Sequence, residues 1–304
     1  RQVFSNFPNL VKLSCTNLSL TTLNGLDCLT KLEYLDCSKN SLTTLHGIRN
    51  CVNLKYLFCY SNQIEHIKSL KKCSKLVELN CSENYIKSLE GLNPSSLKIL
   101  SCSYNELKNL DGLGAQLLAI DIRYNYLMSL KGIEKCINLQ ELYCCSNMLK
   151  SLSNLELCTN LRVLHCDFNV ITNLNELRNC TQLRELSCSN NRLTTINLEA
   201  NINLQILDCT GNQITSLSGL KKCVHLFWLD CDFNKIDNSE KHLYDNIHSL
   251  LNVIGMDIQK INDYNHDSSV PINLESLFNT PKIFHNIPYE ETLLTFESKV
   301  SIRN

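Results

Sequence analysis

Residues 32–45 read LEYLDCSKNSLTTL, and this stretch decides the fold because its pattern returns along most of the chain. Four leucines frame one cysteine and one asparagine in the order LxxLxCxxNxLxxL. Residues 54–67, 76–89, 161–174 and 183–196 repeat the pattern, and eleven units follow one another between residue 10 and about residue 237 at steps of 20 to 22 residues. A fixed period of this length is typical of a stacked repeat architecture.

Each unit predicts one short strand. Leu35 and Cys37 alternate with Tyr34, Asp36 and Ser38, so one side of the strand is apolar and the other is free to vary. Such strands bury their apolar side only by stacking, and the constant period makes the stack a parallel sheet. The return to the next strand takes about nine residues, which leaves room for a 3₁₀ turn but not for a long helix.

The pattern resembles the leucine-rich repeat family over about four fifths of the chain. Its period is similar to that of the 22-residue class, which includes the nuclear regulatory subunit of protein phosphatase 1 and the bacterial internalins, some of which carry a cysteine ladder. The expected fold is an α/β solenoid: a right-handed superhelix of about eleven coils with a parallel concave sheet and short 3₁₀ or irregular convex segments. The resemblance implies that the concave face holds a protein partner.

The eighteen cysteines of the chain follow the repeat. Neighbouring strand positions place Cβ atoms about 4.8 Å apart, which is longer than the ~3.5–4.5 Å of a disulfide. No CxxC spacing for zinc is present. We therefore expect seventeen free thiols in the core, ten on the strands and seven on the return segments: Cys15, Cys37, Cys59, Cys81, Cys102, Cys144, Cys166, Cys188, Cys209 and Cys231; Cys28, Cys51, Cys73, Cys136, Cys158, Cys180 and Cys223.

The remaining cysteine, Cys145, is expected to point outward beside Arg123 and Asp167. An incidental exposed thiol is the favoured interpretation, and a thiol activated by the neighbouring arginine is the alternative. So many free thiols favour a reducing, intracellular (cytoplasmic) location, although a secreted or host-delivered effector stays open. The sequence shows no signal peptide, membrane span or lipidation motif.

The asparagine of each unit falls where the chain turns off the strand. A buried amide at this place can satisfy backbone groups of its own coil and of the next one. We expect a structural asparagine ladder made of Asn40, Asn62, Asn84, Asn105, Asn125, Asn147, Asn169, Asn191, Asn212 and Asn234, with Leu18 in the slot of the first unit.

The side chains that alternate with the core residues form three outward columns, and function is expected there. Their acidic members outnumber their basic members, Lys12 and Arg123, and include Glu141 and Glu185. Exposed aromatic residues among acidic ones are typical of a protein-binding hot spot, although stacking between strands is the structural alternative for the first aromatic cluster. The candidate partner-binding residues are Tyr34, Asp36, Tyr56, Phe58, Tyr60, Glu78, Asp121, Arg123, Tyr143, His165, Asp167, Asp208, Trp228, Asp230 and Asp232.

Outside the repeats, we expect a short N-terminal cap over residues 1–9 that uses Val3, Phe4 and Phe7, the solenoid over residues 10–238, and a helical or mixed C-terminal cap over residues 239–304. Residues 241–261 carry the apolar spacing of an amphipathic helix that would cover the last coil. The thin N-terminal cap suggests that a preceding segment is absent.

Several function classes follow. No catalytic, phosphate-binding or metal-binding motif is present, so no enzyme activity, cofactor or metal is expected. The leading hypothesis is a monomeric protein-interaction scaffold whose acidic, aromatic face binds a basic protein or peptide, and neither nucleic acid nor a membrane. The alternatives are the repeat region of a larger effector or ubiquitin-ligase adaptor whose catalytic or F-box segment is absent, and a pathogen surface adhesin of the internalin type.

Overall fold

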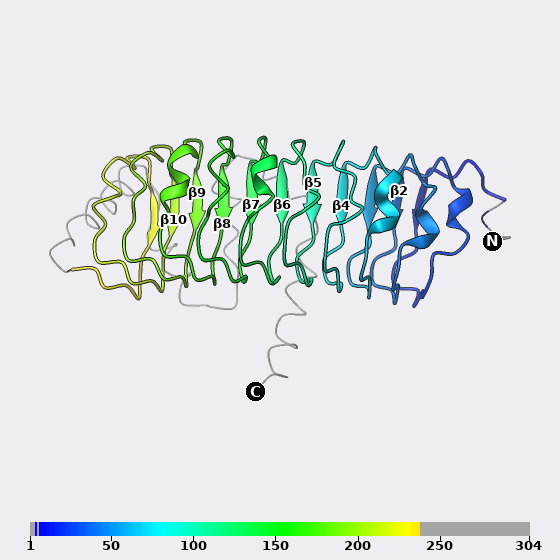
Figure 1. Cartoon of the computed structure of the whole chain (residues 1–304), viewed down its shortest axis with the longest axis horizontal. Coiled ribbons are helices and arrows are strands. Elements are labelled where there is room, and N and C mark those ends of the chain that lie inside the picture. The colour runs from blue at the N-terminus through cyan, green and yellow to red at the C-terminus, as the bar shows by residue number, and fades with distance from the viewer. Residues whose placement is uncertain (1–3, 5, 238–304) are drawn as a thin grey trace, which may run out of the picture. The chain divides into compact units, whose positions relative to one another are not determined.

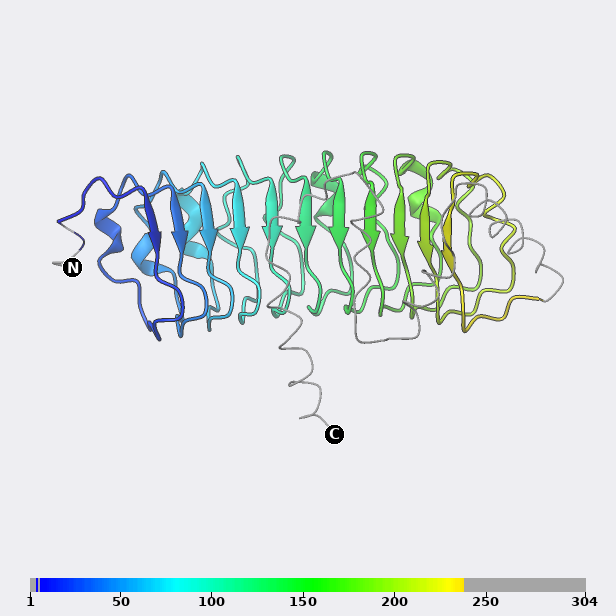
Figure 2. The same cartoon turned by 180° about the vertical axis from the view of Figure 1, so that it is seen from behind.

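The computed structural model describes residue 4 and residues 6–237 of the chain, which divides into the units Arg1–Ile254 and Gly255–Asn304. The described part of the first unit is a solenoid whose eleven strands form one parallel sheet in sequence order (Figures 1 and 2). The strands are β1 (Lys12–Ser14), β2 (Tyr34–Asp36), β3 (Tyr56–Phe58), β4 (Glu78–Asn80), β5 (Ile99–Ser101), β6 (Ala119–Asp121), β7 (Glu141–Tyr143), β8 (Val163–His165), β9 (Glu185–Ser187), β10 (Ile206–Asp208) and β11 (Trp228–Asp230). The predicted parallel solenoid of about eleven coils is confirmed.

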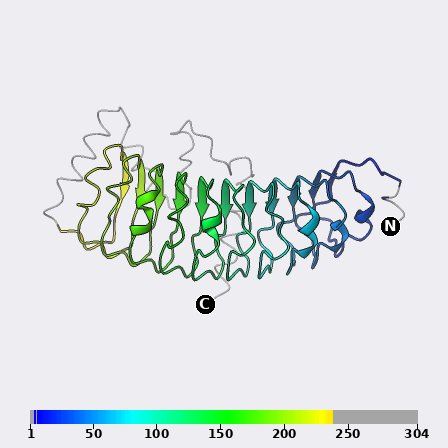
Figure 3. The same ribbon diagram turned by 45° about the horizontal axis from the view of Figure 1, so that its top comes forward.

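The return segments carry short 3₁₀ turns on the side of the coils away from the sheet. Figure 3 shows these turns together with the strands of successive coils, which stand side by side. Five such turns are present in the described part: η1 (Leu26–Cys28), η2 (His46–Ile48), η3 (Lys68–Lys72), η4 (Ile133–Lys135) and η5 (Asn175–Asn179). Coils approach very closely here, because a Cβ added at Gly47 would lie 1.9 Å from the carbonyl oxygen of Leu23. Glycine at this slot is therefore a packing requirement.

The core is one continuous column of leucine, isoleucine and cysteine side chains that runs through all coils. All eighteen cysteines are free thiols, and fifteen of them are buried. The expectation that both cysteine sets lie wholly in the core is wrong at the first coil, where Cys28 is exposed and Cys15 is only partly buried. Cys28 is exposed because it lies one residue before the core slot of its return segment, which the buried Leu29 fills, and Cys15 is only partly buried because no described coil precedes its own.

Each ladder asparagine joins two coils through its amide. Asn62, for example, accepts a hydrogen bond from the Leu42 backbone N–H at 3.0 Å and donates to the carbonyl oxygens of Cys37 and Cys59 at 3.1 and 3.0 Å. The residue just before the asparagine lies in the left-handed backbone region in every coil from the second to the eleventh, with φ between 52° and 66°. The turn thus reverses the chain while every buried amide atom of Asn62 keeps a partner.

At the N-terminal end, Phe4 packs against the core whereas Phe7 is exposed. Val3 and the predicted C-terminal cap over residues 239–304 lie outside the described residues. The right-handed sense of the superhelix stays a prediction.

Candidate functional site

The strand face is the outer surface of the sheet, formed by the first and third residue of each strand and by the residue two positions after it. The parallel register sets these residues in columns, so that Tyr34 lies opposite Tyr56 and Asp36 lies opposite Phe58. Figure 2 shows this face of the sheet toward the viewer. The structure divides the candidate residues on it into three zones.

The aromatic zone covers β2 and β3. The ring of Tyr34 lies 5.6 Å from that of Phe58 and 6.5 Å from that of Tyr56, both at a tilt of 42°. The ammonium group of Lys12 stands 4.4 Å above the Tyr34 ring. Tyr56 remains 39% exposed, so the cluster combines stacking between strands with a surface open to a partner.

Carboxylates border this aromatic zone. Asp36 accepts a hydrogen bond from the Ser38 backbone N–H at 3.1 Å, and Glu78 lies opposite Tyr56 in the register. Burial raises the pKa of the Glu78 carboxyl above its ordinary value. Burial and the neighbouring Asp36 raise the pKa of the Tyr34 hydroxyl, which therefore stays protonated at neutral pH.

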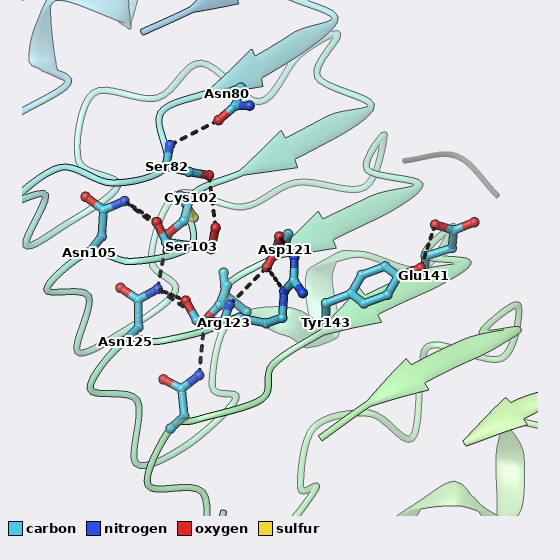
Figure 4. A network of polar contacts seen from close by, with 12 residues as sticks. Asn80, Ser82, Cys102, Ser103, Asn105, Asp121, Arg123, Asn125, Glu141 and Tyr143 are labelled. Carbon is cyan, nitrogen blue, oxygen red and sulfur yellow. Dashed lines mark hydrogen bonds and ion pairs between the residues drawn. The ribbon is translucent and has the colours of Figure 1, made fainter. Parts of the chain in front are cut away.

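The paired zone covers β6 to β9, where charged and polar side chains bind one another. The guanidinium of Arg123 donates two hydrogen bonds to Asp121, at 2.9 and 2.7 Å, and lies 5.7 Å from the Tyr143 ring centre (Figure 4). The Tyr143 ring packs edge-on against the His165 ring, with 5.0 Å between the ring centres. The Nε2 atom of His165 in turn lies 2.7 Å from a carboxylate oxygen of Glu185. The charges of Asp121 and Arg123 thus offset each other within the face.

Asp167 is the most heavily bonded carboxylate of the paired zone. It accepts hydrogen bonds from the Ser187 hydroxyl at 2.5 Å, from the Ser189 backbone and hydroxyl at 2.8 and 2.9 Å, and from the Cys145 thiol at 3.0 Å. Burial, followed by the charge of Asp167, raises the pKa of Cys145 far above its ordinary value. The alternative that Arg123 activates this thiol is therefore wrong: Arg123 binds Asp121, and the thiol of Cys145 donates to the carboxylate of Asp167, whose charge disfavours the thiolate.

The acidic zone covers β10 and β11. Thr210 donates its hydroxyl to Asp230 at 2.7 Å and its backbone N–H to Asp208 at 3.0 Å. Asp232 is exposed, and Trp228 lies opposite Ile206 in the register. Burial raises the pKa of the Asp208 carboxyl. None of the three carboxylates Asp208, Asp230 and Asp232 forms an ion pair with a described residue, so this end of the face is acidic.

Two features escaped the sequence analysis. One is a second amide ladder at the entry to the strands, in which each amide donates to a carbonyl 22 or 23 residues earlier; the members are Asn53, Asn138, Asn160 and Asn203. Its signal is the asparagine that precedes the first leucine of several units. The other is a group of exposed aromatic and methionine side chains in the segment just after the strands.

Within the described residues, no three histidine, cysteine, aspartate or glutamate side chains gather as a group able to hold a metal ion. The same part of the chain contains no helix long and apolar enough to span a membrane.

Comparison with known proteins agrees with this architecture. The family model described as leucine-rich repeats (two copies) matches residues 52–94, 137–179, 159–200 and 181–222. The functional domain of InlJ from Listeria monocytogenes, described as including a cysteine ladder, is 30% identical with a TM-score of 0.66, covering 76% of this chain and 55% of that chain. The internalin InlF from the same organism is 23% identical with a TM-score of 0.66, covering 78% of each chain.

A more distant structure shares the fold alone. The leucine-rich repeat ectodomain of the Arabidopsis thaliana receptor kinase GASSHO1/SCHENGEN3, in complex with Casparian strip integrity factor 2, is 18% identical with a TM-score of 0.57, covering 76% of this chain and 33% of that chain. No curated protein matches the sequence.

The repeat, the parallel sheet and these matches define the class: the chain is a leucine-rich repeat protein. Within that class, its column of buried cysteines makes it similar to InlJ, whose functional domain includes a cysteine ladder. The leucine-rich repeat fold supports protein–protein interaction in general.

Proposed function

We propose that the chain is a non-enzymatic, monomeric interaction scaffold and that it binds a basic segment of a protein or peptide on the strand face. The observation that carries the proposal is the aromatic zone, in which Tyr34, Tyr56 and Phe58 cluster next to the carboxylates of Asp36 and Glu78. Aromatic side chains bordered by polar groups are enriched where binding energy is concentrated.

The chemistry of this zone favours a cationic side chain. Lys12 already stands over one face of the Tyr34 ring, which shows that the zone accommodates an ammonium group. A lysine or arginine of the partner would gain the same attraction over the exposed Tyr56 ring, together with the field of Asp36 and Glu78. A phosphate backbone would be repelled, so nucleic acid is not the proposed ligand.

The acidic zone provides a second contact for an extended partner. From β2 to β10 the sheet takes eight steps of about 4.8 Å, so the aromatic and acidic zones lie roughly 38 Å apart. In the paired zone between them, Arg123 offsets the charge of Asp121, and Asp167 is already held by the serine hydroxyls of the next coil. A basic partner long enough to reach both zones would bind more tightly than either contact alone allows.

The test compares the wild type with the triple variant Tyr56→Ala, Phe58→Ala and Asp36→Lys. Each protein is immobilised, and proteins captured from a lysate as well as a panel of labelled basic and acidic peptides are quantified. We expect the variant to lose one dominant basic partner, because it loses both aromatic anchors and reverses one charge. Circular dichroism checks that the variant is folded.

The matched control is Ile137→Ser with Val224→Ser, which changes exposed apolar residues away from the strand face and should leave capture unchanged. Equal recovery of every partner by the wild type and the triple variant would remove the strand-face proposal.

For the location, we propose a reducing intracellular compartment, because eighteen free thiols are chemically safest there. A second candidate function is an internalin-like adhesin, favoured by the 30% identity to InlJ and by the shared cysteine ladder. The full-length reading frame separates the two: a secretion signal or a surface anchor supports the adhesin, and an F-box or catalytic segment supports an adaptor or effector.

A further inference from the structure

The segment that follows each strand forms a flank of the solenoid, separate from the strand face. Successive coils are tied together along it by backbone hydrogen bonds: Tyr104 N–H donates to Arg123 O and Tyr124 N–H to Cys145 O, at 2.9 and 3.0 Å. Two residues further on, Met148 N–H donates to Leu127 O at 2.8 Å. Side chains at equivalent slots of coils five to eight therefore lie next to one another.

This flank carries a group of large apolar side chains in contact with solvent, which we call the flank patch. The exposed fractions of its members are 38% for Tyr104, 52% for Tyr126, 63% for Met128, 38% for Met148 and 59% for Phe168. The Tyr104 ring stacks on the Tyr124 ring at 4.2 Å and 10°. Tyr126 and Met148 occupy the same slot of neighbouring coils, as do Tyr104 and Tyr124. Single exposed apolar residues are ordinary, whereas a group of them spread over four successive coils of one flank indicates an interaction site.

Two members of the patch occupy an unfavourable backbone conformation. Phe168 and Tyr104 have φ of 52° and 53°, in the slot just before the ladder asparagine. Gly211 fills the same slot of the tenth coil, so the turn itself does not need a side chain there. Lysine, serine, glutamate and asparagine occupy the same slot in other coils, so the turn does not require an aromatic ring there.

The charges around the patch are mainly basic. Lys108, Lys150 and Arg192 are exposed on the same flank, and none of them forms an ion pair within the described part of the chain. Two acidic neighbours, Glu83 and Glu106, are partly buried, and Glu83 accepts a hydrogen bond from the Ser61 hydroxyl at 2.5 Å. Glu65, two coils before Glu106, is bound to Lys87 at 3.7 Å. The flank patch is thus apolar in the centre and positively charged at its border.

We propose that the flank patch binds an acidic amphipathic segment of a partner protein. Apolar residues of the segment would pack on Tyr126, Met128 and Phe168, and its carboxylates would face Lys108 and Lys150. The patch spans three coil steps, about 14 Å, which a helix of roughly three turns (~16 Å) covers. Methionine suits such a surface because its flexible side chain adapts to an apolar partner.

This site differs from the strand face in both place and charge, since the strand face is proposed to bind a basic partner. A test that refutes one of the two proposals therefore leaves the other unaffected. A protein with both sites would hold a basic partner and an acidic partner at the same time.

The test uses a short labelled amphipathic peptide with glutamate on one helical face and leucine on the other, and fluorescence anisotropy measures its binding. Two companion peptides replace glutamate by lysine or leucine by serine. We expect saturable binding of the first peptide and at least tenfold weaker binding of both companions. The variant Met128→Ser with Met148→Ser should also weaken binding tenfold or more, and Lys108→Glu with Lys150→Glu should do the same.

The controls are matched in chemistry. Ile137→Ser with Leu157→Ser, which alters exposed apolar residues of the return segments, should bind like the wild type, as should the strand-face triple variant. Phe168→Gly should raise the melting temperature and weaken binding, whereas Phe233→Gly, which relieves the same strain three coils away, should raise it without affecting binding.

Equal binding of the glutamate and lysine peptides, unchanged binding by the methionine variant, or loss of binding in the return-segment control would each overturn the proposal. So would the absence of peptide binding combined with sedimentation of the protein with phosphatidylserine vesicles, because the patch would then recognise a membrane surface instead.

Discussion

Replacing Asn125 by alanine tests the physical account of the solenoid most directly. Its Oδ1 accepts the Leu107 backbone N–H at 2.9 Å, and its Nδ2 donates to the carbonyl oxygens of Cys102 and Ile122 at 3.1 Å and of Arg123 at 3.2 Å. Figure 4 shows Asn125 below Asn105, the ladder residue of the preceding coil. Both the donor and the acceptor sides of the amide are used.

The cost of the substitution is unequal on the two sides. Each of the three carbonyl oxygens keeps another donor: Asn105 Nδ2 for Cys102, Asn147 Nδ2 for Ile122 and the Tyr104 N–H for Arg123. The Leu107 N–H, on a fully buried residue, has no second acceptor within the described part of the chain. An unpaired buried N–H costs about 1–3 kcal/mol, and with the lost packing we expect Asn125→Ala to lower the free energy of unfolding by about 2–4 kcal/mol.

Asn125→Asp separates the two sides of the amide. The aspartate keeps an acceptor for Leu107 but turns a carboxyl oxygen toward three carbonyl oxygens, which disfavours its charge. The pKa of this carboxyl in the folded state should therefore lie above its unfolded value of about 3.9. A raised pKa means that stability is lost as the pH rises through it, so the deficit of the variant relative to the wild type should grow from about pH 4 to pH 7.

Urea unfolding followed by circular dichroism measures both variants, and Asn160→Ala is the control. Asn160 is exposed and its amide makes a single bond, to the Ile137 carbonyl at 3.1 Å, so its loss should change the stability by about 0.5 kcal/mol or less. An Asn125→Ala variant as stable as this control would refute the reasoning. An Asn125→Asp variant with a flat pH profile would refute the electrostatic part of it.

Three further predictions follow from the core and the strand face. Gly47→Ala places a methyl group against the Leu23 carbonyl and should destabilise the fold by about 1–3 kcal/mol or more, visible as a lower melting temperature; an unchanged melting temperature would contradict the close approach of these coils. Alkylation of the native protein at about pH 8 should modify Cys28 first, since it is exposed whereas burial raises the pKa of Cys73 to about 11; peptide mass spectrometry that finds Cys73 or Cys145 modified first would contradict this. Glu78→Gln should gain stability relative to the wild type as the pH rises from about 4 to 7, because burial raises the pKa of the Glu78 carboxyl and the folded state disfavours its charge; parallel pH profiles of the two proteins would exclude this cost.

Most of the fold was predictable because one pattern fixes it many times over. Leucine at four slots and cysteine at a fifth leave no other register in which the apolar residues become buried, and a slip by one residue would expose all of them. The exceptions lie at the end of the array. Cys28 lies four residues before the first leucine of the next repeat, one residue earlier than the slot that Cys51 fills, and the fully buried Leu29 fills that slot in the first coil.

The sequence predicted which residues lie on the strand face, but not which of their side chains bind one another. The alternation of Tyr34 and Asp36 with the core residues determined that they face outward, and the structure places them on the strand face. Nothing in the repeat indicated that Asp121 would turn to Arg123 in its own coil, or that Asp167 would accept bonds from two serines of the next coil. A count of acidic residues therefore does not show which carboxylates are already held by partners within the face.

The sequence by itself determined the period, the parallel order of the coils and the side of each strand that is buried, because these follow from local spacing and from the need to cover apolar surface. Only the tertiary structure decided which outward carboxylates remain available, how Cys145 is held by Asp167, and that Tyr126, Met128 and Phe168 gather on one flank. Those features depend on contacts between residues about 20 apart in the chain, where the size and rotamer of each neighbour decide the outcome.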